Sequence, residues 1–321
     1  MDVREEVLKA EERIRPYIRE TTLEYSPCLS KLGDAHVWCK LENLQHTGAF
    51  KVRGSMNKLL SLSPRDRARG VVAASTGNHG VAVAYSIEEH DSPGIIFVPR
   101  KTDPAKVKAI ERCGVDVRFH GTDAVKTEMH ARRFAAERDM IYISPYNDPK
   151  IIGGQGTIAV ELERQINGID ALFASVGGGG LISGIAGYLK GINPDIRIIG
   201  CSPENSKVMA ESVKAGEILD IPSLPTLSEG TAGGVEKGAI TLDLCRELVD
   251  EFVTVTEKDI ADSLLEFMQT HLMLIEGAAA VSLASYIKKK RELKGKNIVI
   301  IICGANISLA LLKKVLNDSN I

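Results

Sequence analysis

Hydrophobic and polar positions follow two periods along this chain, one typical of helices and one typical of strands. Apolar side chains recur at helical spacing in residues 3–14, and Pro16 ends that pattern. Residues 37–41 alternate as a strand does, and residues 55–62 favour a short helix. The apolar positions that share one face of the first helix are Val3, Val7, Ala10 and Ile14.

From residue 70 onward, strand-like apolar runs alternate with helix-like amphipathic segments. Strands are predicted at 70–74, 94–98, 116–119, 140–143, 171–175, 197–201, 252–255 and 297–302. Helices are predicted at 78–89, 104–113, 124–138, 156–165, 181–189, 206–215, 239–249 and 257–271, and after residue 306. This alternation predicts an α/β fold with helices on both faces of parallel sheets. We expect a change of lobe near Pro145 and Pro149, and a functional loop at 218–238 because that segment is too long for a simple turn.

Composition and charge exclude several classes of function. With 321 residues, the chain is long enough for two domains, each with its own core. Hydrophobic residues make up 44% of the chain and charged residues 26%, so a globular protein is expected. A net charge of -2 leaves no electrostatic footprint for nucleic acid or for an anionic membrane. The basic run Lys288–Arg291 is interpreted as the solvated end of a helix.

The cysteines and the apolar runs indicate a cytoplasmic protein. No cysteines form a pair at metal or redox spacing, so reduced thiols are the simplest interpretation. The charged N-terminus lacks the apolar core of a secretory signal, and no apolar run approaches the length of a membrane span. The cysteines are Cys28, Cys39, Cys113, Cys201, Cys245 and Cys303.

Lys51 stands between the strand at 37–41 and the following helix, in the apolar, glycine-flanked stretch His46–Gly54. The end of a strand is the usual place for a ligand in α/β sheets. A lysine next to Phe50 and several glycines can lose water, which lowers its pKa and frees the amine to form a Schiff base. On these residues alone, a surface lysine whose stem covers Phe50 is an equal alternative.

A phosphate site is predicted at Gly177, Gly178, Gly179 and Gly180, which stand directly between a strand and a helix. Main-chain N–H groups can converge on a phosphate there, and the helix dipole favours its charge. The dinucleotide-binding fingerprint does not fit, because its third glycine would fall on Ile182 or Ser183. A strained turn without a ligand is the alternative.

Three further segments carry polar groups at the ends of predicted elements. Ser75–Gly80 offers hydroxyls, an amide, an imidazole and free N–H groups, a set suited to a carboxylate, although Ser75 or Thr76 would equally serve as an N-cap. Cys303 closes the last strand and is by default an inert buried thiol. Glu276 is an acid among apolar residues, and a charge at a helix N-terminus is its simplest interpretation.

Five motifs together resemble the fold-type II pyridoxal phosphate (PLP) enzymes, specifically the serine/threonine dehydratase and serine racemase group. They occur in the family's order and span nearly the whole chain. The motifs are Thr47-Gly48-Ala49-Phe50-Lys51-Val52-Arg53-Gly54, Ser75-Thr76-Gly77-Asn78-His79, Gly153-Gly154-Gln155-Gly156-Thr157, Ser175-Val176-Gly177-Gly178-Gly179-Gly180-Leu181 and Cys303-Gly304-Ala305-Asn306. The resemblance implies two α/β lobes, each a mostly parallel twisted sheet flanked by helices. It divides the chain into a large PLP-binding domain, residues 1–53 and 147–321, and a small domain, residues 54–146.

The resemblance also implies a role for each site residue. Lys51 holds the cofactor covalently, Asn78 bonds the 3-oxygen of its ring, and Cys303 lies beside the pyridine nitrogen. The residues implied to bind the cofactor are Phe50, Lys51, Asn78, Gly177, Gly178, Gly179, Gly180, Leu181, Glu276 and Cys303. The residues implied to bind the amino acid substrate are Ser75, Thr76, Asn78, His79 and Gln155.

The implied reaction is a β-elimination. The amine of Lys51 removes the α-proton of a hydroxy amino acid, the β-hydroxyl leaves, and hydrolysis gives a 2-oxo acid and ammonia. A thiol at Cys303 is a weak donor that cannot stabilise a pyridinium as a carboxylate would, so a long-lived carbanion is disfavoured. Elimination therefore suits this site better than transamination.

Four departures from the family's pattern limit what the resemblance implies. Ala49 replaces the serine of most members, so one polar contact near the cofactor is missing. Thr76 replaces the acid/base serine of the racemases; its hydroxyl is a second candidate catalytic group, but its methyl restricts χ1 and makes racemisation the lesser interpretation. Ser202 and Val208 replace two metal-binding acids, so no metal is predicted. The chain ends at Ile321 without a regulatory domain, and feedback inhibition by isoleucine is not expected.

The leading hypothesis is a PLP-dependent ammonia-lyase for L-threonine, L-serine or a related β-hydroxy amino acid. Alternatives are a serine racemase and a lyase for 3-hydroxyaspartate or for a hydroxyectoine-pathway substrate. A PLP-binding protein without catalysis is a further alternative, and the failed fingerprint disfavours a Rossmann dehydrogenase. The resemblance suggests a homodimer that acts on a small amino acid.

Overall fold

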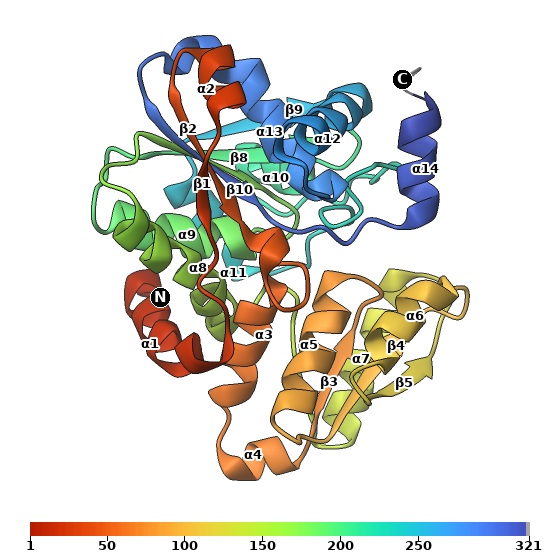
Figure 1. The fold of residues 1–321 in the computed structure, drawn as a ribbon. Coiled ribbons are helices and arrows are strands. Elements are labelled where there is room, and N and C mark those ends of the chain that lie inside the picture. The colour runs from red at the N-terminus through yellow and green to blue at the C-terminus, as the bar shows by residue number, and fades with distance from the viewer. Residues whose placement is uncertain (319–321) are drawn as a thin grey trace.

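The computed structural model describes residues 1–318, which form two β-sheets flanked by helices (Figure 1). The larger sheet has six strands in the order β1-β2-β10-β7-β8-β9. All neighbouring strands in it are parallel except β1 and β2, which are antiparallel. Its strands are β1 (Leu23–Tyr25), β2 (His36–Leu41), β7 (Ala171–Ser175), β8 (Arg197–Pro203), β9 (Glu251–Val255) and β10 (Asn297–Ile302).

The smaller sheet has four parallel strands in the order β5-β4-β3-β6. Successive residues of a strand face opposite sides, so Val71 and Ala73 of β3 join one core cluster while Val72 joins another. Helices α5 and α6 cover the first side, and α7 covers the second. The elements of this part are β3 (Val71–Ala74), α5 (Asn78–Glu89), β4 (Gly94–Val98), α6 (Pro104–Glu111), β5 (Asp116–Phe119), α7 (Ala124–Glu137) and β6 (Ile141–Tyr142).

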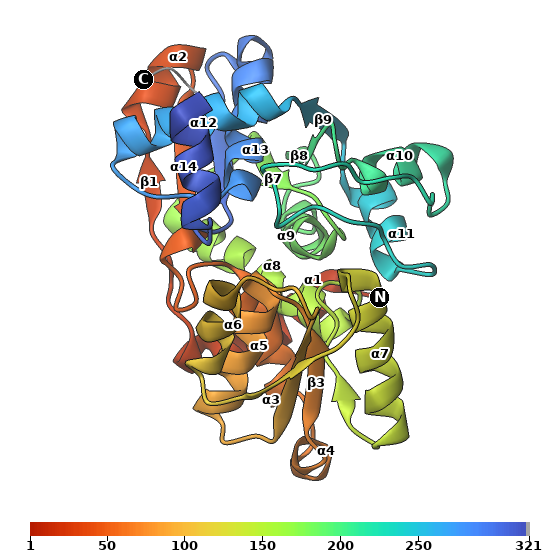
Figure 2. The same ribbon diagram turned by 90° about the vertical axis from the view of Figure 1, so that its right-hand side faces the viewer.

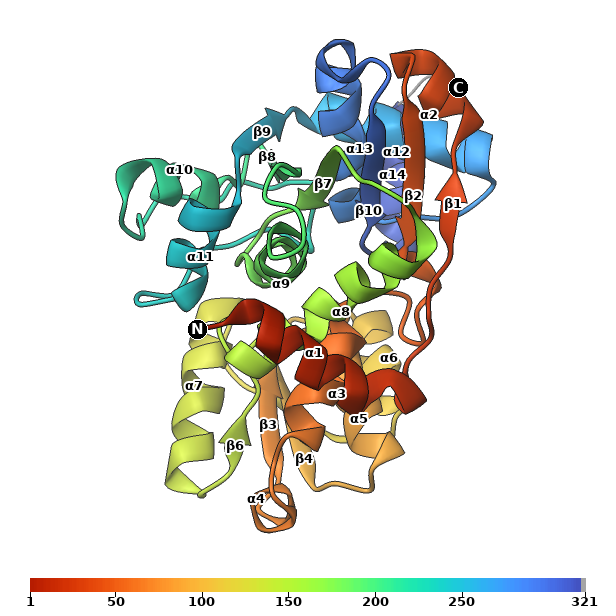
Figure 3. The same ribbon diagram turned by 90° about the vertical axis from the view of Figure 1, so that its left-hand side faces the viewer.

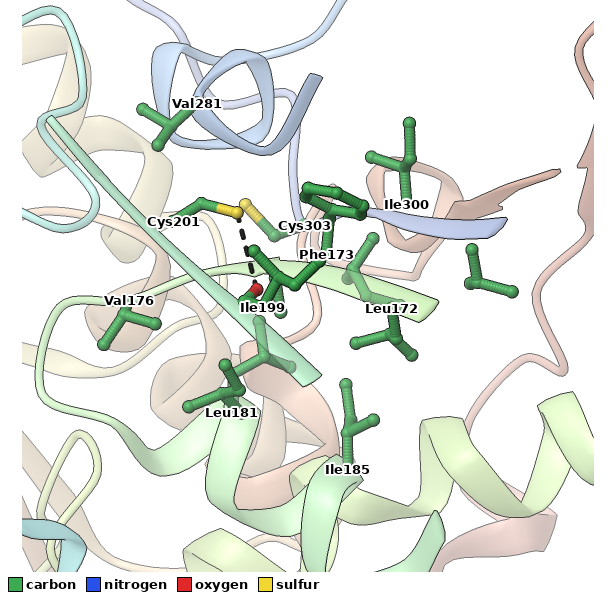
Figure 4. Packing of buried hydrophobic residues seen from close by; sticks show 14 of the residues in the cluster. Leu172, Phe173, Val176, Leu181, Ile185, Ile199, Cys201, Val281, Ile300 and Cys303 are labelled. Carbon is green, nitrogen blue, oxygen red and sulfur yellow. Dashed lines mark hydrogen bonds between the residues drawn. The ribbon is translucent and has the colours of Figure 1, made fainter. Parts of the chain in front are cut away.

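The core of the larger sheet lies on both of its faces. Val281 of α13 (Gly277–Lys289) lies on one side, while Leu181 and Ile185 of α9 (Gly180–Lys190) lie on the other (Figure 4). The central strand β10 is buried from Ile298 to Ile302, as its continuous apolar run requires of a strand covered on both faces.

Helix α8 (Pro149–Gln165) lies between the two sheets together with α1 (Val3–Ile14), as Figures 2 and 3 show. Helix α8 begins seven residues earlier than the prediction at 156, which was wrong because the run Gly153–Gly156 contains three poor helix formers. Close packing outweighs that low propensity: a Cβ on Gly154 would lie 2.6 Å from the Arg53 carbonyl oxygen, and one on Gly156 would lie 2.3 Å from a Val7 methyl carbon.

Apart from the short 3-10 helices, three elements were not anticipated from the sequence, namely β1, α2 and α4. Strand β1 is three residues long and α4 is five, too short for a periodic pattern to be recognised. The elements not yet named are η1 (Arg15–Tyr17), α2 (Pro27–Gly33), η2 (Glu42–Leu44), α3 (Lys51–Leu60), α4 (Pro64–Ala68), α10 (Val208–Ala215), α11 (Ile240–Leu248), α12 (Glu257–His271), η3 (Lys290–Leu293) and α14 (Leu309–Asp318).

The strands of the smaller sheet all come from residues 71–142, and those of the larger sheet come from outside that range. The domain boundary implied at residues 53/54 falls inside α3, which packs both on α8 and on α5. This boundary and the one implied at 146/147 stay predictions. Among residues 1–318, none of the helices is long and apolar enough to span a membrane.

Four fully buried charged side chains join α3 to the rest of the fold. Arg53 of α3 lies 2.7 Å from a carboxylate oxygen of Glu42 and 2.7 Å from one of Glu161, and Lys40 lies 2.6 Å from the other oxygen of Glu161. Burial by itself would raise the pKa of Glu161, but the charges and hydrogen bonds of Arg53 and Lys40 outweigh it and lower that pKa to about 2. The cluster therefore holds two cations and two anions that compensate one another.

We expect Arg53→Met to lower the free energy of unfolding by about 3–5 kcal/mol, because it leaves the buried carboxylate of Glu42 without its cation and Glu161 with only Lys40 inside the cluster. Urea unfolding of the purified protein measures the loss. Arg69→Met is the matched control: Arg69 pairs with Asp66 and Asp139 at the surface, so its loss should cost at most about 1 kcal/mol. Equal losses in the two variants would contradict the argument.

Candidate active site

The loop that carries Lys51 is hydrogen-bonded to the end of strand β10. The N–H of Phe50 donates to the Cys303 carbonyl at 3.1 Å, and the N–H of Ala305 donates to the Gly48 carbonyl at 2.9 Å. Gly48 adopts a φ of 70°, which favours glycine and lets the loop turn back toward α3. Two segments that are about 250 residues apart in sequence thus form one rim of the site.

Lys51 is the first residue of α3 rather than part of the loop before the predicted helix at 55–62. Its amine donates a hydrogen bond to the Pro145 carbonyl at 2.7 Å and lies 5.1 Å from the centre of the Phe50 ring. Burial lowers the pKa of Lys51 to about 8, and the nearby Cys303 and Glu276 offset that effect only in part. A usable fraction of this amine is therefore neutral near physiological pH.

Glu276, the residue before α13, gathers polar groups from two other segments. The side-chain amide of Asn78 donates to its two carboxylate oxygens at 3.0 and 2.9 Å, and the N–H of Asn306 donates to one of them at 3.1 Å. The Asn306 amide in turn donates to the Asn78 oxygen. Burial raises the pKa of Glu276, while these hydrogen bonds oppose the rise. Asn78 thus brings the start of α5 against the larger sheet.

Cys303 is buried next to the same carboxylate. The Ser175 hydroxyl donates to its sulfur at 3.4 Å, and the thiol lies 3.8 Å from Glu276 Oε1. Burial raises the pKa of the Cys303 thiol well above its ordinary value, with the negative charge of Glu276 acting in the same direction. This thiol therefore stays protonated, consistent with the weak donor expected from the sequence.

The four glycines form the turn that leads from β7 into α9. Gly179 has a φ of 86°, and a Cβ on Gly178 would lie 2.3 Å from the Tyr146 ring. On the other side of the turn, a Cβ on Gly177 would lie 3.0 Å from the Thr231 Cα. Within residues 1–318, the main-chain N–H groups from 177 to 182 make no hydrogen bond, so the turn presents free donors at a helix N-terminus.

The segment 75–80 lies at the end of β3 and the start of α5. Ser75 accepts a hydrogen bond from the Gly77 N–H, and the Thr76 hydroxyl makes none among the described residues; both side chains are half-buried. His79 is buried and its Nε2 lies 3.0 Å from the Ile143 carbonyl. Burial and the charge of Lys51 lower the pKa of His79 to about 3, so the ring is neutral. The imidazole of His79 thus points to the end of β6. What His79 offers at the start of α5 is its main-chain N–H.

Gln155 was expected to bind substrate and is 1% exposed inside α8. Its side-chain oxygen accepts a hydrogen bond from the Gly54 N–H at 3.2 Å. Gln155 therefore supports α3 three residues after Lys51, and its role toward a substrate stays a prediction.

The sequence reasoning did not single out Pro145 and Tyr146, although both lie in the site. They come three and four residues after the last residue of the short strand β6, so the same rule that selected the other sites, the carboxyl end of a parallel strand, applied to them as well. Asn306 was part of a motif but was given no role. Among the described residues, no three His, Cys, Asp or Glu side chains are grouped to hold a metal ion.

Fold and site together define an α/β enzyme that binds an anionic cofactor next to a reactive lysine. The chain belongs to the family of pyridoxal-phosphate dependent enzymes, whose family model matches residues 14–304. The resemblance drawn from the five motifs is thereby confirmed.

Relatives of known name agree with this family. The chain is 36% identical over 314 residues to an L-threonine ammonia-lyase of Thermotoga maritima, which covers 98% of this chain and 78% of that protein. A solved structure of the processed form of threonine deaminase isoform 2 from Solanum lycopersicum superimposes with a TM-score of 0.94 at 31% identity, covering 99% of this chain and 87% of the other. Maize serine racemase gives a TM-score of 0.92 at 30% identity, with 98% and 97% covered. The predicted two-lobed α/β fold is confirmed.

The residues of the site fit pyridoxal phosphate in two respects. The free N–H groups of the turn at 177–182 are the donors that a phosphate needs. The half-buried amine of Lys51, whose pKa is about 8, is the nucleophile that an aldehyde needs. Residues 145–146 connect the glycine turn with Lys51. The Lys51 amine donates a hydrogen bond to the Pro145 carbonyl, and the Tyr146 ring packs on Gly178.

We expect Gly178→Ala to raise the dissociation constant for PLP at least about tenfold, because the added methyl group overlaps the Tyr146 ring and must displace the turn. Titration of the apoprotein with PLP, followed by absorbance, measures this constant. Gly234→Ala is the control, since its Cβ would meet open space. Wild-type affinity in the Gly178 variant would contradict the packing argument.

We expect the rate of covalent PLP uptake by the apoprotein to rise with pH and to level off above about 8, because only the neutral form of Lys51 attacks an aldehyde. Stopped-flow absorbance across a pH series measures the rate. A lysine with its ordinary pKa would instead give a rate that still rises about tenfold per pH unit beyond pH 9.

Proposed function

We propose that this protein is a PLP-dependent ammonia-lyase that converts L-threonine, L-serine or a related β-hydroxy amino acid to a 2-oxo acid and ammonia. The observation that carries the proposal is the Lys51 amine, desolvated and held 2.7 Å from the Pro145 carbonyl beside the glycine turn. Relatives named as threonine ammonia-lyase and threonine deaminase support the substrate class.

In this proposal the chain holds the cofactor at three places. The N–H groups of the turn from Gly177 to Leu181 would hold the phosphate, Lys51 would hold the aldehyde carbon, and Phe50 would contact the ring. Asn78 would bond the ring 3-oxygen, Glu276 would hold Asn78 in place, and Cys303 would lie beside the pyridine nitrogen. Bound PLP supplies the electron sink that acidifies the α-hydrogen of the amino acid.

The remaining chemistry falls to the chain's own groups. The substrate carboxylate takes the free N–H groups at the start of α5 with the hydroxyls of Ser75 and Thr76, while His79 contributes its main chain. The neutral amine of Lys51 would take the α-proton as a general base. The thiol of Cys303 keeps its proton, so the ring nitrogen gains little positive charge and prompt loss of the β-hydroxyl is favoured.

Racemisation of serine is the second candidate function, and one observation favours it. The Thr76 hydroxyl makes no hydrogen bond within the described part of the chain, so it is free to carry a proton. The similarity to maize serine racemase is consistent with this candidate.

We expect the protein to release 2-oxo acid and ammonia from at least one member of a panel of β-hydroxy amino acids, and Lys51→Ala to lower that rate by at least about a thousandfold. A coupled 2-oxo acid assay measures the rate, and chiral analysis after incubation with L-serine detects D-serine. Lys126→Ala, at an exposed lysine of α7, is the control. Normal turnover in the Lys51 variant would remove this residue from the mechanism, and D-serine without pyruvate would favour racemisation.

Two predictions concern the setting of the protein rather than its site. The resemblance suggests a homodimer, which light scattering on the purified protein would test. The scattered cysteines favour a cytoplasmic location, which fractionation of cells would test.

A further inference from the structure

Tyr146 touches two parts of the site at once. Its ring lies against the glycine turn, where a Cβ on Gly178 would come within 2.3 Å of it, and a Cβ on Gly180 would lie 3.0 Å from the Tyr146 Cβ. Its hydroxyl accepts a hydrogen bond from the main-chain N–H of Glu236 at 2.8 Å. The ring and the hydroxyl of one side chain therefore serve different segments, so a substitution can separate them.

Glu236 is held a second time through its side chain. Its carboxylate lies 2.6 Å from the guanidinium of Arg132 on α7. Arg132 also donates to Glu128 on the same helix and stacks over the Tyr142 ring at 4.3 Å, so its position is fixed by the smaller sheet. The main chain and the carboxylate of Glu236 are thus both anchored to residues of the region 128–146.

The segment that ends at Glu236 runs through the site. Thr231 packs on the glycine turn at Gly177, and a Cβ on Gly230 would lie 3.2 Å from Glu276 Oε1. The preceding residue, Glu229, pairs with Lys106 of α6 at 3.1 Å. The turn at 230–231 therefore lies between two residues, Glu229 and Glu236, that each form an ion pair with a helix beside the smaller sheet.

We infer that Tyr146 and Arg132 are positioning residues that hold residues 229–236, through Glu236, as one wall of the amino acid site. This inference rests on the proposed function. The Tyr146 ring packs against the glycine turn that would hold the phosphate. The Tyr146 hydroxyl and Arg132 instead fix the position of residues 229–236, which the substrate would contact. Loss of the hydroxyl or of the ion pair should therefore weaken substrate binding and leave cofactor binding intact.

Tyr146→Phe removes the hydroxyl and keeps the ring. We expect its KM for the hydroxy amino acid to rise about fivefold, the effect of losing one hydrogen bond of average net strength, with kcat and the PLP dissociation constant within about twofold of wild type. Tyr146→Leu removes the ring as well, and its PLP dissociation constant should rise about tenfold. The control is Tyr188→Phe, which loses a hydrogen bond to Glu163 away from the segment and should change neither constant.

Glu236→Gln tests the ion pair separately. The pair is partly exposed, so salt should screen it: between about 0.05 and 0.5 M NaCl, the wild-type KM should rise a few-fold and that of Glu236→Gln should stay nearly constant. Because both contacts hold one residue, the KM of the double variant Tyr146→Phe/Glu236→Gln should rise less than the product of the single effects.

Amide hydrogen exchange supplies a readout that needs no substrate. In the PLP-bound protein, exchange in peptides that contain Glu236 should be faster in Tyr146→Phe than in wild type, while Tyr188→Phe should match wild type. Unchanged exchange, or a KM equal to wild type in an active Tyr146→Phe enzyme, would overturn the inference. Wild-type protein that binds PLP but turns over no hydroxy amino acid would instead refute the proposed function, and the exchange result would still decide whether Tyr146 holds the segment.

Discussion

The position of the site depends on a cluster of four buried charges, one of which lies two residues after Lys51 on α3. Arg53, Lys40, Glu42 and Glu161 have no exposed side-chain surface, so each must find its counter-charge inside the protein. Meeting that demand fixes β2, η2, α3 and α8 relative to one another, because each of these elements contributes one member. Lys51 precedes Arg53 by two residues on α3, so the charge cluster also fixes where the reactive amine lies.

In front of this cluster, burial moves the functional groups toward their neutral forms. It lowers the pKa values of Lys51 and His79 and raises those of Glu276 and the Cys303 thiol. A neutral amine can attack a carbonyl and take a proton, and a neutral thiol leaves a ring nitrogen uncharged. The protein thus keeps compensated charges in the cluster that joins its helices, and it favours the neutral forms of the groups where the proposed chemistry takes place.

Sequence reasoning located most elements and most of the site's loops. The helices at 78–89 and 257–271 and the strands at 94–98 and 297–302 have the predicted bounds, because the helices carry a clear period and the strands a continuous apolar run, each between clear end signals. The prediction was wrong at the start of α8, where three glycines argue against a helix but permit α1 and α3 to approach. It also missed Tyr146, which has no motif around it. The contact of Gln155 with α3 was not foreseen either, and its expected role toward a substrate stays a prediction.

The sequence by itself determined the α/β alternation and the loops at strand ends that carry chemistry, since both depend on neighbours within a few residues along the chain. Only the tertiary structure decided which side chains meet. Arg53 pairs with Glu161 and the Tyr146 ring packs on Gly178, and neither contact is encoded in the local pattern at either end. Such contacts depend on shape and on the cost of buried charge, which arise only when distant segments are brought together.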